Sequence, residues 1–251
     1  MISKLYNQTS SFYSNADLYN AEADFFEDIP FWKRFCKKRG GKVLELACGT
    51  GRVGLSIIES GLSYDGLDFS YDFVRFFKEK IKGKKTSSIK KGDMRNFSLN
   101  KKFDTIIMPY NSLAHLYNIK DLIKCFTCVK NHLKKEGQFA FQIFNPDVVF
   151  MTSQNDPVFL GDFETEKGES FQLWEENDYD RATQINSLEW TYEFDDGRVL
   201  KKKNSMRMFF PQEIDSILSL MGLKIVKKYG DFKKSKFSNK SNLQIIVATN
   251  M

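Results

Sequence analysis

Histidine is scarce in this chain, with 2 in 251 residues, and the 4 cysteines include a single C-x-x-C pair, Cys125 and Cys128. The pair falls inside a predicted helix with no further Cys or His cluster beside it, so we interpret it as apolar filling and expect no metal site. There is no signal-type apolar segment and no apolar run of about 20 residues, which disfavours export and membrane spanning. We therefore expect a cytoplasmic protein.

The net charge of the chain is also small. The chain has 38 basic and 32 acidic residues, a net charge of +6, and its basic residues are scattered. This distribution does not suit a nucleic-acid surface, although it suits an anionic small molecule. With 41% apolar and 28% charged residues, the composition indicates one globular α/β unit of generous size, with at most a modest insertion. We expect a monomer or weak homodimer with a small-molecule partner, no nucleic acid and no membrane.

Strand and helix patterns alternate from residue 43 onward. Each predicted strand is apolar on both faces, which is typical of a parallel sheet covered by helices on two sides. Right-handed crossovers then give a Rossmann-like, doubly wound α/β fold. The predicted strands are 43–47, 63–67, 86–90, 103–108, 138–144, 223–229 and 243–249, and the predicted helices are 51–60, 71–81, 119–133 and one that starts near Pro211.

The pattern of polar and apolar residues changes after Pro146. Polar and apolar residues alternate over 170–176, 182–194 and 199–210, which predicts two or three antiparallel strands with a hairpin turn at 195–198. We expect three parts: an N-terminal helical lid segment (1–40), a Rossmann-like domain (41–146 and 211–251), and an antiparallel β cap (147–210) inserted after the fifth strand.

A glycine turn follows the first predicted strand, in the sequence VLELACGTGR (43–52). Glycine lets the backbone turn sharply and lets a ligand approach the chain closely. Glu45 precedes the turn, and Asp68 closes the next strand. A carboxylate at that second position can accept both ribose hydroxyls of an adenosine, so the pattern favours an adenosyl ligand.

Together these motifs resemble those of the class I S-adenosylmethionine-dependent methyltransferases. The resemblance spans most of residues 35–145 and continues through KGDMRNF (91–97) and FDTIIMPYNSLAHL (103–116). It implies a seven-stranded sheet and S-adenosylmethionine as the cofactor, released as S-adenosylhomocysteine. Ala47 stands where the family often has its first motif glycine.

The resemblance also implies residue roles. The turn at Ala47 and Gly49 lies against the methionine part, Asp68 holds the ribose, Phe69 packs on adenine and Asp93 bonds its amino group. Tyr110 and His115 follow the fourth strand near the methyl group and are the candidate catalytic residues, whereas we expect His132 to face solvent. The full set of candidate cofactor-binding residues is Tyr13, Glu45, Ala47, Gly49, Gly51, Arg52, Asp68, Phe69, Asp93, Met94 and Asn111.

The acceptor is expected to be small and polar. The chain also resembles O- and N-methyltransferases of small molecules, including sugar and glycine-type N-methyltransferases and enzymes of bacterial surface-polysaccharide (capsular phosphoramidate) modification. Candidate acceptor contacts in or near the cap are Trp174, Trp190, Arg207 and Tyr229. Two alternatives stay open: a non-catalytic adenosyl-binding regulatory module, and an NAD-dependent oxidoreductase, because Gly54 completes the dinucleotide spacing after Gly51.

Overall fold

A seven-stranded mixed sheet forms the centre of the computed structural model, which describes residues 2–22, 27–153 and 156–251. Its strand order is β10-β11-β5-β4-β1-β2-β3, with parallel pairing from β5 to β3 and antiparallel pairing of β11 with β5 and β10. The predicted Rossmann-like, mostly parallel sheet is confirmed. The strands are β1 (Lys42–Leu46), β2 (Ser63–Asp68), β3 (Ser87–Lys91), β4 (Phe103–Met108), β5 (Leu133–Phe144), β10 (Leu223–Tyr229) and β11 (Leu243–Asn250).

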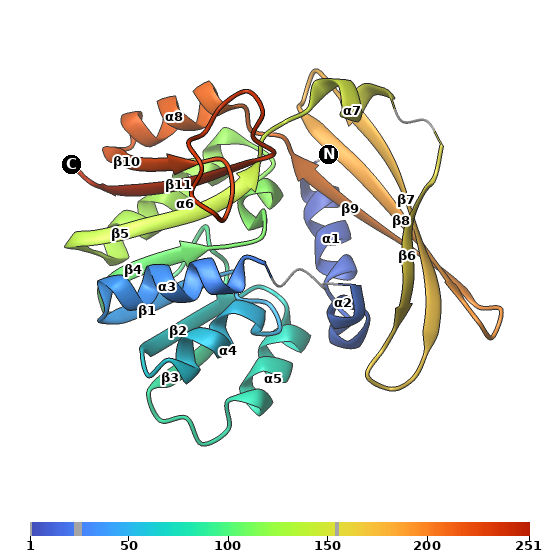
Figure 1. Cartoon of the computed structure of the whole chain (residues 1–251), viewed down its shortest axis with the longest axis horizontal. Coiled ribbons are helices and arrows are strands. Elements are labelled where there is room, and N and C mark those ends of the chain that lie inside the picture. Colours follow the sequence, from blue (N-terminus) through green and yellow to red (C-terminus); the bar gives the residue numbers. More distant parts are fainter. Residues whose placement is uncertain (1, 23–26, 154–155) are drawn as a thin grey trace.

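Helices cover both faces of this sheet, as the apolar strands predict (Figure 1). On β4, Ile106 and Met108 pack into one apolar cluster while Ile107, between them, packs into the other. This period-2 alternation explains why the strand reads as a continuous apolar run. One face carries α6 (Ile119–His132) and α8 (Pro211–Leu220); the other carries α3 (Ile29–Arg39), α4 (Arg52–Glu59) and α5 (Tyr71–Lys80).

The cap is a second, antiparallel sheet in the order β6-β7-β8-β9. It has four strands, because β6 is present in addition to those predicted. That strand lies at an edge of the cap sheet and its residues are at least partly exposed, and its apolar residues do not alternate with polar ones along the sequence VFLGDFE, so the period-2 pattern of a strand is absent. The short α7 (Val148–Ser153) precedes β6 (Val158–Glu164), β7 (Ser170–Asp180), β8 (Ile185–Phe194) and β9 (Val199–Arg207).

The first part of the N-terminal segment, residues 2–22, lies between the two sheets, whereas α3 covers the main sheet (Figure 1). It forms α1 (Ile2–Phe12), which runs along β9, and α2 (Ala16–Glu22), whose Leu18 packs against apolar residues of the cap. Residues 1 and 23–26 of this segment lie outside the described residues. The short 3₁₀ turn η1 (Ser112–His115) follows β4 and contacts β5 and β9. None of the described helices is long and apolar enough to cross a membrane.

Candidate active site

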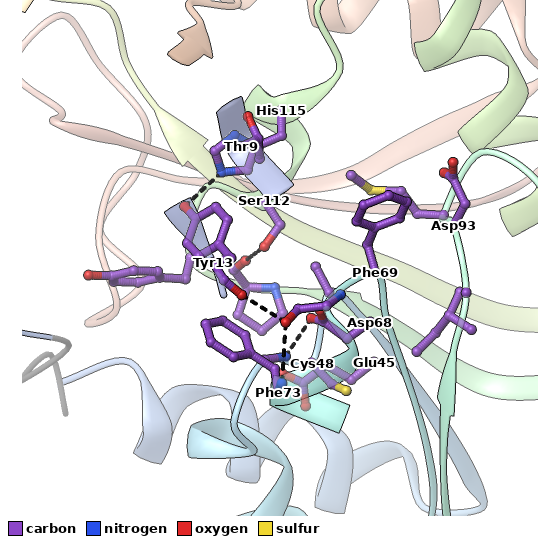
Figure 2. Close-up of a pocket in the computed structure, with 18 of the residues that line it drawn as sticks. Thr9, Tyr13, Glu45, Cys48, Asp68, Phe69, Phe73, Asp93, Ser112 and His115 are labelled. Atoms are coloured by element: carbon purple, nitrogen blue, oxygen red, sulfur yellow. Dashed lines mark hydrogen bonds between the residues drawn. The ribbon is translucent and has the colours of Figure 1, made fainter. Parts of the chain in front are cut away.

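A pocket is lined by residues at the carboxyl ends of β1, β2 and β4 and by residues of α1. This is where open α/β sheets bind ligands, because the strand order reverses there. Residues from the first glycine turn, the end of β2, the loop after β3, the loop after β4 and the N-terminal segment all line it (Figure 2).

The glycine turn and the acid at the end of β2 meet in this pocket. The Gly49 amide donates a hydrogen bond to Asp68 Oδ2 at 2.7 Å, and the Ser70 amide donates to Oδ1 at 2.8 Å. Burial raises the pKa of Asp68 to about 6, although these backbone bonds oppose the shift. Ala47 and Gly49 both have positive φ angles, of 54° and 55°. The predicted neighbourhood of turn and carboxylate is therefore present.

The three motif glycines differ in surroundings. A Cβ on Gly49 would meet only Tyr19 Cε1, at 4.0 Å, so that position has room for a ligand. Gly51 does not line the pocket. A Cβ on Gly51 would lie 2.3 Å from the Phe77 ring, so this position faces the protein interior. A Cβ on Gly54 would lie 2.4 Å from Tyr64 Oη. The latter two glycines permit close packing of α4 on its neighbours.

Glu45 is buried at the base of the pocket. The Tyr64 hydroxyl donates to its Oε2 at 2.7 Å, and burial raises the pKa of Glu45 to about 8. Arg52, at the start of α4, also lines the pocket and forms a bidentate ion pair with Asp28. Its guanidinium lies 5.0 Å from the centre of the Tyr110 ring. This end of the pocket thus combines a cation, a buried acid and an aromatic ring.

The opposite end is apolar at the rim. Phe69 and Met94 line it, and the Phe69 ring is 52% exposed. Asp93 is also present, but Arg95 binds both its carboxylate oxygens, at 2.6 to 3.0 Å. Burial alone would raise the pKa of Asp93, but the bonds from Arg95 outweigh it and lower the pKa. Figure 2 shows Phe69 and Asp93 near one another at this rim.

The residues after β4 occupy unusual backbone positions. Tyr110 and Asn111 have φ angles of 55° and 58°, a conformation that is costly for residues other than glycine and that clusters at functional sites. Tyr110 lines the pocket, and burial raises its pKa to about 12. Asn111 is 5% exposed and is not among the lining residues, so the structure does not bring it to the pocket with the others.

Tyr13 and His115 form a hydrogen-bonded pair in the pocket wall (Figure 2). Tyr13 Oη and His115 Nε2 are 3.0 Å apart, and the rings meet edge to face. Burial lowers the pKa of His115 to about 4, so its imidazole is neutral near pH 7. The pair joins the end of α1 to η1, two segments about a hundred positions apart in the chain.

Two sequence-based interpretations need correction. His132 does not face solvent: it is 6% exposed, its Nδ1 donates to the Cys128 carbonyl at 2.7 Å and its Nε2 accepts from the Leu99 amide at 3.1 Å. Tyr229, a candidate acceptor contact, does not line the pocket: it lies on β10, in agreement with the strand predicted over 223–229, and packs against Phe31.

The three cap candidates for acceptor contacts do not line the pocket either. Trp190 donates a hydrogen bond to Glu175 at 2.7 Å, and Arg207 forms an ion pair with Glu213 at 2.6 Å. Both side chains therefore make structural contacts outside the pocket. In the described residues no group of three or more His, Cys, Asp or Glu side chains is arranged to hold a metal ion.

Several pocket residues had no signal in the sequence. Arg95 stacks on the Tyr6 ring at 4.0 Å, and Tyr6 donates to Asp121 at 2.7 Å, which fastens α1 to α6. Thr9 contacts the Tyr117 hydroxyl. The ion pair of Asp93 with Arg95, two positions away, is the one contact that local spacing could have suggested.

A glycine turn and a carboxylate at adjacent strand ends, in a pocket that residues of α1 and α2 also line, define an adenosyl-binding α/β protein. Comparison with known proteins narrows this class. A family model described as a methyltransferase domain matches residues 43–137. The glycine/sarcosine N-methyltransferase of Aphanothece halophytica is 24% identical over 242 residues, which cover 92% of this chain and 85% of that protein.

Solved structures agree in fold. The CcbJ methyltransferase of Streptomyces caelestis superposes with a TM-score of 0.82 at 21% identity, covering 97% of this chain and 98% of that one. CalS10, an amino pentose methyltransferase from Micromonospora echinaspora solved with S-adenosylmethionine bound, gives a TM-score of 0.68 at 17% identity over 89% of each chain. The chain is a class I S-adenosylmethionine-dependent methyltransferase, and S-adenosylmethionine is its cofactor.

Proposed function

We propose that this enzyme transfers a methyl group to a nitrogen or oxygen of a small polar acceptor, and that a small amine is the preferred substrate. The observation that carries the proposal is that one pocket contains the Gly49–Asp68 contact and the Tyr13–His115 pair. The first suits an adenosine and the second suits removal of a proton from an acceptor.

The pocket residues fit the cofactor. Asp68 accepts two backbone hydrogen bonds and keeps further lone pairs for two ribose hydroxyls. The space beside Gly49 lets a ligand approach the backbone closely. The exposed Phe69 ring, with Met94, offers a surface for adenine. Arg52 supplies a cation for the methionine carboxylate, oriented by Asp28.

Asp93 is assigned a weaker part. Its oxygens already accept several bonds from Arg95, so we propose that it closes the adenine end mainly through this ion pair and contacts the adenine amino group with its remaining lone pairs.

Methyl transfer needs alignment more than chemistry from side chains. Bound S-adenosylmethionine supplies an electrophilic methyl carbon on a positively charged sulfur. Tyr13, Tyr19 and Tyr110 surround the proposed transfer position with aromatic rings, which favour a cationic sulfur and a cationic amine. The neutral His115 imidazole, reached through Tyr13, is the proposed proton acceptor.

An amine acceptor is favoured for two reasons. The aromatic surroundings suit a methylammonium product, and two of the named relatives, glycine/sarcosine N-methyltransferase and the amino pentose methyltransferase CalS10, are named for acceptors that contain an amine. Arg52 is assigned to Asp28 and the methionine carboxylate, and Arg95 is paired with Asp93, so neither guanidinium is left for an anionic acceptor. This speaks against the narrower hypothesis of capsular phosphoramidate methylation.

The test is direct. Calorimetry with S-adenosylmethionine establishes binding, and release of S-adenosylhomocysteine is then followed with a panel of glycine, sarcosine, nucleotide-linked amino sugars and a sugar phosphoramidate. The proposal expects turnover with one of the amines. Turnover with the phosphoramidate alone would replace the amine, and binding without turnover of any polar small molecule would favour the regulatory module.

A further inference from the structure

Two adjacent residues of the cap strand β9 hold the Tyr13–His115 pair from the side opposite the main sheet. The Ser205 carbonyl oxygen is 3.1 Å from His115 Nδ1, and it also accepts from the Tyr117 hydroxyl at 2.9 Å. Asn204 Nδ2 is 3.3 Å from Tyr13 Oη. Asn204 and Ser205 are each only 2% exposed, so their bonds to the pair lie in the protein interior.

The carbonyl of Ser205 determines which histidine nitrogen carries the proton. A carbonyl oxygen only accepts, so Nδ1 of His115 must be the donor, and a neutral imidazole has just one N–H. Nε2 is therefore a bare acceptor that faces the Tyr13 hydroxyl. The tautomer of His115 follows from a backbone group of the cap.

The orientation of Asn204 is determined in the same way. The Ser205 amide donates to Asn204 Oδ1 at 2.9 Å, and a backbone N–H cannot accept. The amide oxygen must lie toward Ser205, which leaves the Asn204 NH₂ group toward Tyr13. Because the Tyr13 oxygen receives this bond, its own proton points to His115. All bonds then run in one direction, from Asn204 through Tyr13 and His115 to Ser205.

We propose that Asn204 is a positioning residue, which directs the Tyr13 proton to His115 so that the Tyr13 oxygen takes the proton of the methyl acceptor. The inference rests on the proposed function. As the nucleophile's lone pair bonds to the methyl carbon, the carbon–sulfur pair returns to sulfur. The nucleophile's proton passes to Tyr13 Oη while the Tyr13 proton passes to His115 Nε2. The imidazolium so formed keeps its Nδ1–H on the Ser205 carbonyl.

The other ionisable groups near the pair do not set this direction. Burial raises the pKa values of the neighbouring phenols above their ordinary value, so they are neutral near pH 7. Lys202 of β9 donates to the Phe12 carbonyl beside Tyr13, at 3.2 Å, instead of to the pair. The neighbouring phenols with raised pKa values are those of Tyr19 on α2, Tyr110 after β4, Tyr117 after η1 and Tyr192 on β8.

The first test is nitrogen NMR of the imidazoles in the protein without cofactor. The chain has only 2 histidines, so the His132→Gln variant assigns both signals. The expected result is a His115 ring protonated at Nδ1 and bare at Nε2. A ring protonated at Nε2 would overturn the inference without any assay of activity.

The second test compares Asn204→Asp with Asn204→Leu. A carboxylate at this position accepts the Tyr13 proton and turns it away from His115, whereas leucine only removes the donor, so that His115 Nε2 alone then orients the Tyr13 proton. We expect kcat to fall by about 10- to 100-fold in Asn204→Asp, with KM for S-adenosylmethionine nearly unchanged, and to fall far less in Asn204→Leu.

The outcomes separate the two proposals. Equal kcat in the two variants, with cofactor binding intact, contradicts the role of Asn204 and leaves the proposed function standing. Absence of S-adenosylmethionine binding in the unaltered protein contradicts the proposed function instead. If Asn204→Asp does not fold, the His115 tautomer in the unaltered protein and in Asn204→Leu still decides, since leucine is expected to leave it unchanged.

Discussion

Gly49 and Asp68 are joined by a hydrogen bond of 2.7 Å between the Gly49 amide and Asp68 Oδ2, although one follows β1 and the other ends β2. The parallel pairing of these strands places their carboxyl ends side by side. The bond fixes the glycine turn against the acid, so the two halves of an adenosine site have a defined geometry before any ligand arrives.

Replacing Asp68 by asparagine should weaken S-adenosylmethionine binding by about 1–3 kcal/mol, because charge-assisted bonds to the ribose are lost. Calorimetry measures the change. The control is Asp65→Asn, on the same strand, where the buried carboxylate pairs with Lys101 away from the pocket. Equal affinity of the Asp68 variant and the unaltered protein would remove Asp68 from the cofactor site.

The cofactor half of the pocket could be predicted because its residues are local to strand ends. Glu45, Gly49 and Asp68 occur in two short segments whose apolar strands and turns have strong patterns, and parallel pairing then brings them together. Phe69 and Met94 also reach the pocket from predicted loops. Asn111 is also a predicted cofactor contact, but it is buried and does not line the pocket, because sequence position alone does not give the direction of a side chain.

The acceptor half could not be predicted in the same way. Tyr13 meets Asn204 across 191 positions, and nothing in either segment marks the contact. The expectation that His132 faces solvent is wrong for the same reason: its ring packs against Phe97 in a tilted arrangement and bonds to backbone groups. The position of a polar side chain is decided by the partners that burial makes available, and those come from distant segments.

Gly54→Ala should destabilise the fold without changing cofactor affinity. The added methyl group would lie 2.4 Å from Tyr64 Oη and 2.7 Å from the Phe77 ring, a steric clash typically worth about 1–3 kcal/mol. The melting temperature should fall by roughly 2–4 °C per kcal/mol for a chain of this size. A large loss of S-adenosylmethionine affinity at unchanged stability would instead assign Gly54 to ligand binding.

Glu45 should make the protein without cofactor less stable as pH rises. Burial raises its folded pKa from 4.5 to about 8, so between these values the folded state binds more protons than the unfolded state. Stability attributable to this group is therefore greatest at acidic pH and declines through that window. Melting curves from pH 5 to 8 should show a shallower decline in Glu45→Gln, whose side-chain oxygen still accepts from Tyr64. An unchanged slope would contradict the shift.

His115→Asn should lower kcat by about 100-fold, because the variant keeps a polar side chain but has no basic nitrogen to accept the Tyr13 proton. The pH profile gives a sharper check. A histidine accepts a proton only in its neutral form, which predominates above its pKa, and burial lowers that pKa from 6.5 to about 4. The kcat of the unaltered enzyme, measured at saturating concentrations of both substrates, should therefore stay constant as pH falls to about 5 and decline only below that pH. A decline centred near pH 6.5 would mean that the imidazole is solvated in the working enzyme, and the buried Tyr13–His115 pair would not be the route of the proton.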